Sequence, residues 1–263
     1  MHATLLLAGI LELGVAAAFG HVGRAMWNRP VGEAARRASL SFATWWIAIA
    51  CLTGIDASVR LLGAFDAATT VILTTEIYAA LPLLCLGLAG LVYYFVFVLT
   101  GNPRALRVIS VYYAVLYVAC LYWFARLGRV TLSANEWNVR LVFANDATGA
   151  PIWILAAALM GPLIITGIAY SRLYSQVEDA TQRYRIAMAA GSIFVWIVSV
   201  VLSGASGRSD AATWAVTARI MGLAAAIAIV MAYLPPAWVK RRYHVVALHE
   251  EKGGPGERAS ASP

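Results

Sequence analysis

Five ionisable side chains stand inside long apolar stretches of the sequence: Glu12, Asp56, Arg60, Glu76 and Arg219. A charged side chain at the centre of a lipid-facing helix costs about 2.5–3.5 kcal/mol, so such residues are expected to turn inward and to pair. Asp56 and Arg60 are four residues apart, which places them on one helical face within reach of each other. Residues of these types can hold a small polar molecule, or they can join helices as ion pairs.

Several familiar chemistries lack the residues that they need. Retinal requires a lysine inside the helices, but Lys240 and Lys252 both follow the last apolar stretch. Bis-histidine haem requires two histidines at membrane depth, and only His21 lies near a stretch. The serine of Gly-Ala-Ser-Gly at 204–207 has no histidine base in the stretch that follows. We therefore expect no catalytic residues, no metal and no cofactor.

The composition indicates a membrane protein, because 61% of the 263 residues are hydrophobic and only 13% are charged. Backbone polar groups must be satisfied internally in lipid, so isolated apolar stretches of about 20 residues are expected to be helices. The sequence predicts an all-α bundle of seven transmembrane helices within a domain of residues 1–242. The seven stretches are 5–26, 40–62, 72–100, 108–124, 151–173, 186–203 and 212–238.

The distribution of Lys and Arg predicts the orientation. Fourteen of these residues fall on the side of the C-terminus and six on the other side. The positive-inside rule then places the N-terminus outside and the C-terminus in the cytoplasm of a multi-pass cell (plasma) membrane protein. Because the basic residues sit at the ends of stretches and not in one patch, we expect the lipid bilayer as a partner and no nucleic acid.

Other local patterns concern turns and packing. Residues 125–150 alternate apolar and polar side chains, which predicts an outer β-hairpin, although an irregular loop fits as well. Pro82 predicts a kink, and Pro235–Pro236 predict the end of the seventh helix. Gly87 and Gly90, and the pair Gly161 and Gly167, are small residues expected at close helix contacts. The polar tail, residues 243–263, is expected to be disordered.

A rise of about 1.5 Å per residue places the five ionisable residues in one layer of the outer part of the bundle. Trp196 lies near the middle of the sixth stretch, where it is a candidate floor for a pocket or an ordinary core aromatic residue. Two interpretations remain open. The layer is a water-accessible pocket for a small polar ligand, or it is a network of ion pairs that holds the helices together.

Two stretches carry a resemblance to a known family. Residues 77–102 contain an early proline and end in Tyr-Tyr-Phe-Val-Phe-Val-Leu-Thr-Gly-Asn, and residues 170–185 form a basic linker. Residues 39–243 resemble the seven-helix transmembrane sensory domain of prokaryotic histidine kinases, stand-alone or N-terminal. The resemblance implies a module that senses a stimulus and signals to a kinase. Only residues 243–263 follow here, too few for a transmitter domain, so a separate partner is expected.

Three functions follow. The first is a receptor-like module that binds a ligand at Glu12, Asp56, Arg60, Glu76, Trp196 and Arg219 and signals to a protein partner at the cytoplasmic face, through Arg104 and Arg107 and through Arg183 and Arg185. The second is a non-catalytic accessory or assembly subunit of a larger membrane complex. The third is a transporter, which the nearly charge-free inner halves of the stretches disfavour.

Overall fold

The computed structural model describes residues 2–29, 32–126, 130–134, 139–143, 150–206 and 212–243. Within these residues, seven helices are long and apolar enough to cross a membrane, and the chain is a multi-pass helical bundle. The elements are α1 (Ala3–Trp27), α2 (Glu33–Ala64), α3 (Thr70–Thr100), α4 (Ala105–Arg126), β1 (Val130–Ala134), β2 (Val139–Phe143), α5 (Ala150–Arg172), a 3-10 turn (Leu173–Ser175), α6 (Ala180–Ser206), α7 (Ala212–Tyr233) and α8 (Ala237–Tyr243). Residues 244–263 of the expected tail lie outside the described residues.

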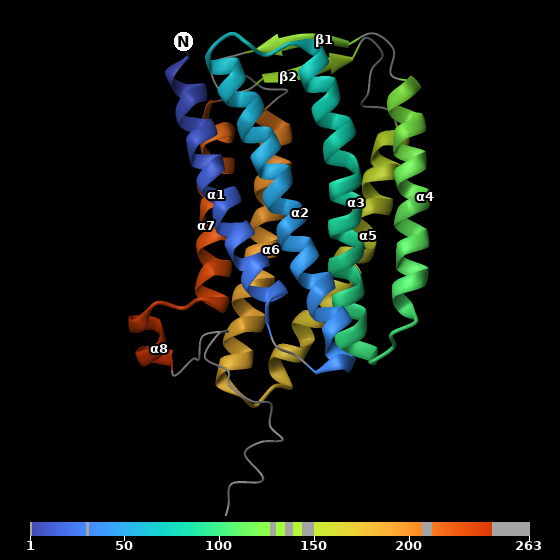
Figure 1. The fold of residues 1–263 in the computed structure, drawn as a ribbon, viewed down its shortest axis with the longest axis vertical. Helices are drawn as coiled ribbons and strands as arrows, with labels where there is room; N and C mark the ends of the chain where they lie inside the picture. Colours follow the sequence, from blue (N-terminus) through green and yellow to red (C-terminus); the bar gives the residue numbers. More distant parts are fainter. Residues whose placement is uncertain are drawn as a thin grey trace, which may run out of the picture.

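The seven long helices run side by side along the long axis of the molecule (Figure 1). Helix α2 packs against both α1 and α3, α6 packs against α7, and α1 joins these two groups by its contact with α7. Helices α4 and α5 lie on the far side of α3. We call the end at which α1 begins, and where β1 and β2 lie, the strand end, and the opposite end the α8 end (Figure 1).

The helix ends follow from local chemistry. The Thr69 hydroxyl accepts a hydrogen bond from the backbone N–H of Ile72 at 3.3 Å and starts α3. Gly101 ends the same helix in the left-handed conformation, at φ +66°. Helix α3 continues through Pro82 as one helix. The prediction for Pro235–Pro236 is confirmed, since α7 ends at Tyr233 and the last residues of the predicted seventh stretch belong to α8.

The closest approach between α2 and α3 depends on glycine. A Cβ atom added at Gly90 would lie 2.5 Å from the Ser41 carbonyl oxygen, and one added at Gly87 would lie 3.0 Å from the Ala48 side chain. These two glycines therefore allow the backbones to meet, as predicted. The prediction is wrong for Gly161, where an added Cβ would meet nothing within 4 Å.

Strands β1 and β2 pair antiparallel, with Val130 opposite Phe143 and Ala134 opposite Val139. Residues 135–138, which connect them, lie outside the described part of the chain. The side chain of Val139 is buried in a small apolar cluster with Leu5, Val59 and Leu73. The pair thus lies over the ends of α2 and α3 at the strand end (Figure 1).

The α8 end of the bundle is more polar than the sequence predicts. Helix α6 begins at Ala180, so Arg185 is part of this helix, and its side chain is only 8% exposed. The sequence analysis placed Arg185 in a loop because hydropathy alone sets the boundary at the first long apolar run. The prediction that the inner halves of the helices are nearly free of charge is therefore corrected, because this end contains one buried guanidinium. The same end also buries Tyr170 and Tyr233.

Replacing Gly90 with alanine tests the contact between α2 and α3. Gly90→Ala is expected to lower the free energy of unfolding by about 1–3 kcal/mol, because the Ser41 backbone cannot move aside. Gly191→Ala in α6 is the control, since its added Cβ meets nothing within 4 Å and it gains the same helix propensity. The measurement is reversible unfolding in detergent micelles. Equal stability of the two variants would contradict the close contact.

Candidate functional site

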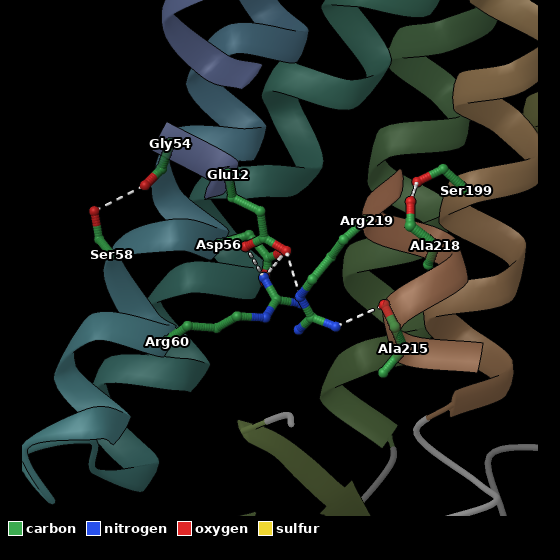
Figure 2. A network of polar contacts seen from close by, with 9 residues as sticks. All are labelled: Glu12, Gly54, Asp56, Ser58, Arg60, Ser199, Ala215, Ala218 and Arg219. Atoms are coloured by element: carbon green, nitrogen blue, oxygen red, sulfur yellow. Dashed lines mark hydrogen bonds and ion pairs between the residues drawn. The ribbon is translucent and has the colours of Figure 1, made fainter. Parts of the chain in front are cut away.

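An ionic network crosses the interior of the bundle in its strand-end half. Arg60 of α2 donates hydrogen bonds through Nη1 to a carboxylate oxygen of Glu12 on α1 and to one of Asp56, one turn earlier on α2. The Arg60 side chain is 3% exposed. Figure 2 shows the side chains of Glu12, Asp56 and Arg60 pointing toward one another. Two carboxylates therefore surround one buried guanidinium, which binds α1 to α2.

Helix α7 joins this network through Arg219. Its Nε lies 3.7 Å from the second carboxylate oxygen of Glu12, and its Nη1 donates to the Ala215 carbonyl at 2.8 Å (Figure 2). Glu12 thus stands between two guanidiniums that come from different helices. Because α1 and α7 belong to different packed groups of helices, this carboxylate links the two groups at one depth.

A cavity of about 320 Å³ lies beside the network. Helices α1, α2, α3, α6 and α7 all contribute to its wall. Its volume is at the small end of the range for ligand sites. Its lining residues are Leu11, Glu12, Val15, Leu52, Thr53, Asp56, Glu76, Ala80, Leu84, Trp196, Ser199, Val200, Ala218, Arg219 and Gly222.

The structure brings all six predicted site residues together. Five of them line the cavity, and Arg60 lies behind Glu12 and Asp56 as their common hydrogen-bond donor. Asp56 is the most accessible member of the network, with 48% of its side chain exposed. Both interpretations of the sequence stay open, because Arg60 joins α1 to α2 by ion pairs, whereas Asp56 and Glu76 line an open space.

The wall opposite the carboxylates is built on α6 and α7. The Ser199 hydroxyl donates to the Ala218 carbonyl at 2.7 Å (Figure 2). A Cβ atom added at Gly222 would lie 3.3 Å from the Ser199 oxygen, so the missing side chain keeps this part of the cavity open. The ring of Trp196 is held edge-on by Trp45 of α2, with 5.4 Å between ring centres. Trp196 and Val200 give this wall apolar surface, and Ser199 and Arg219 give it polar atoms.

Sequence reasoning missed the uncharged members of the site, the hydroxyl residues Thr53 and Ser199 and the small residue Gly222. None of them carries a charge that would stand out in an apolar stretch. Ser199 is seven residues from Ser192, and both hydroxyls donate to carbonyls of α7. That spacing places two hydroxyls on one helical face, and it is a signal in the sequence that could have added Ser199 to Trp196 and Arg219 on this wall.

The arrangement is suited to binding and orientation. It offers carboxylate oxygens, a guanidinium and apolar surface around one small volume. Among the residues that the structure describes, no group of three or more His, Cys, Asp or Glu side chains is placed to hold a metal ion. A ligand here would be held by ion pairing and by contact with apolar side chains.

Removing the central guanidinium tests the network. Arg60→Met is expected to destabilise the fold by about 3–5 kcal/mol, because it leaves the carboxylates of the partly buried Glu12 and of Asp56 without their shared donor. The same change at the exposed Arg126 is the control and should cost less than about 1 kcal/mol. Unfolding in lipid–detergent micelles measures both.

A triple variant provides the check on this interpretation. Adding Glu12→Gln and Asp56→Asn to Arg60→Met removes the uncompensated charges, so it should recover much of the lost stability. Losses that simply add from one substitution to the next would contradict a coupled network and would indicate three independent side chains.

Comparison of the chain with protein-family models, with curated proteins and with solved structures found no match. The resemblance of residues 39–243 to the sensory domains of histidine kinases stays a prediction. The chemistry of the site follows from the geometry of its own residues.

Proposed function

We propose that this protein is a receptor-like integral membrane module that binds a small polar ligand in the cavity between Glu12, Asp56, Glu76 and Arg219. The observation that carries the proposal is the cavity itself, because carboxylates and a guanidinium from α1, α2, α3 and α7 meet around one space of about 320 Å³. Protein interiors have few voids larger than a water molecule, so a volume of this size beside the network favours a binding site over a purely structural role.

The proposal includes an orientation. The strand end faces the outside of the cell membrane and the α8 end faces the cytoplasm, since the basic residues concentrate at the α8 end. The exposed Trp238, Arg241 and Arg242 of α8 fit a helix at the cytoplasmic headgroup level. In this orientation the ligand enters from outside.

Signalling to a separate partner requires two states of the bundle with different ligand affinity. The cavity lies between α1, α2 and α3 on one side and α6 and α7 on the other, so a ligand that contacts Glu76 and Arg219 biases their relative position. From Glu76, α3 continues about 36 Å to Thr100, next to the exposed Arg104 and Arg107. This turn is the proposed partner surface.

The other predicted partner contact is less suited to this role. The Arg183 guanidinium donates to the Val177 carbonyl at 3.0 and 2.7 Å and lies over the Tyr174 ring. Arg185 is buried. Both side chains are therefore engaged within the bundle, and the proposal keeps only Arg104 and Arg107.

An accessory or assembly subunit is the alternative function. Helices α4 and α5 are the least buried of the seven membrane-length helices. They expose apolar side chains that lipid or a neighbouring subunit would cover, among them Val111, Val115, Ile164, Ile165 and Ile168. Subunits that remain bound in stoichiometric amounts after purification in mild detergent would favour this alternative.

Filling the cavity tests ligand binding. Ala80 lines the cavity one turn after Glu76, whereas its neighbour Ala79 is exposed outside it. Native mass spectrometry of protein purified from its own membranes is expected to find a co-purified small molecule in the parent chain and in Ala79→Leu. The same molecule should be absent from Ala80→Leu, because leucine occupies its space. Equal amounts of the co-purified molecule in Ala79→Leu and Ala80→Leu would mean that it binds outside this cavity.

Cysteine labelling tests the orientation. In a variant without Cys51, Cys85 and Cys120, we expect a membrane-impermeant maleimide to label Ala67→Cys at the strand end in intact cells. Gln176→Cys at the α8 end should react only after permeabilisation. Both positions are exposed and lie between helices. The opposite pattern would reverse the proposed orientation.

A further inference from the structure

The carboxyl groups around the cavity outnumber the guanidiniums. Three carboxylates, from Glu12, Asp56 and Glu76, stand against two guanidiniums, from Arg60 and Arg219. Glu12 and Asp56 share Arg60, and Glu12 also pairs with Arg219. Among the residues that the structure describes, Glu76 makes no hydrogen bond or ion pair. The Glu76 carboxyl group on α3 therefore lines an open volume without an ion-pair partner among the described residues.

An ionised carboxylate at this depth is costly unless a positive charge pairs with it, and without such a charge the carboxyl group takes up a proton instead. The cavity offers the space for that charge directly at Glu76, and the accessible carboxylate of Asp56 stands on the same wall. An anionic ligand would gain no ion pair from Glu76 and would be repelled by the Asp56 carboxylate. The charge balance thus favours a cationic occupant.

The remaining wall decides what kind of cation fits. Leu11, Val15, Leu52, Leu84 and Val200 line the cavity with Trp196. A bare metal ion gains nothing from apolar walls. Few oxygen ligands are available to it here, because Arg60 already engages carboxylate oxygens of Glu12 and Asp56. An organic ammonium uses both parts of the site, since its charge pairs with carboxylates and its carbon atoms contact apolar side chains. Tryptophan also attracts ammonium groups.

We propose that the cavity takes a small organic ammonium cation, with its charged nitrogen at Glu76 and Asp56 and its apolar portion against Trp196. This inference rests on the proposed function and names the chemical class of its ligand. Glu76 is the residue that confers the preference for a cation. The Arg60 network keeps the other carboxylates in place.

Binding of three probes of the same shape tests the proposal. The full chain in lipid nanodiscs is titrated with phenethylammonium, with the neutral 2-phenylethanol and with the anionic phenylacetate. The heat of binding or the rise in the unfolding temperature is recorded. The parent protein is expected to bind phenethylammonium at least about tenfold more tightly than either other probe. Glu76→Gln should remove this preference, whereas Glu178→Gln, the same change at an exposed position outside the cavity, should keep it.

Glu76→Asp keeps the carboxyl group and should retain the preference for phenethylammonium. If Glu76→Gln proves unstable, this second variant separates loss of the carboxyl group from loss of the fold. Ala80→Leu should weaken all three probes. If 2-phenylethanol or phenylacetate binds as tightly as phenethylammonium, and Ala80→Leu weakens that binding, the inference of a cationic ligand is wrong. The cavity would then still be a binding site. If no probe binds, or if Ala80→Leu leaves binding unchanged, the inference also fails. The co-purified molecule then decides the proposed function separately.

Discussion

A single guanidinium, that of Arg60, stands at membrane depth with almost no exposure and with carboxylates of two helices around it. An unpaired Arg60 guanidinium in this interior would be strongly destabilising, so the Glu12 and Asp56 carboxylates must stay beside it. This requirement sets the register of α1 against α2, because Glu12 has to face Arg60 at one depth. Through Glu12 it also fixes α7, whose Arg219 reaches the same carboxylate.

The cavity is a consequence of the way two tightly packed groups of helices meet. Gly87 and Gly90 bring α3 against α2, and Ser192 and Ser199 tie α6 to α7 through backbone carbonyls. Between the groups, polar side chains and the absent side chain of Gly222 stop the walls from closing. A space that is bounded by charge on one side and by Trp196 on the other has the layout of a site for an amphipathic molecule.

The sequence predicts those features that have a large energetic cost. Seven long apolar stretches cannot be accommodated except as helices, and charges inside them cannot face lipid, so Glu12, Asp56, Arg60 and Arg219 could be placed in one layer. Features of small cost were missed. Thr53 and Ser199 carry no charge. Arg185 is an exception of large cost, and it was placed in a loop because α6 begins at Ala180, six residues before the apolar run that starts at residue 186. The pairing register of β1 and β2 depends on contacts such as that of Val139, which no local pattern encodes.

The distribution of the network along the chain has a consequence for biosynthesis. Glu12 leaves the ribosome long before Arg60, and Arg219 follows only after four more membrane-length helices, α3 to α6, have been made. The first helix is therefore a poor candidate for release into lipid by itself, since its carboxylate has no counter-charge until the second helix arrives beside it. Insertion of α1 and α2 as a helical pair solves this problem, because Arg60 then enters the membrane beside Glu12. Helix α7 adds the second guanidinium, that of Arg219, near the end of synthesis.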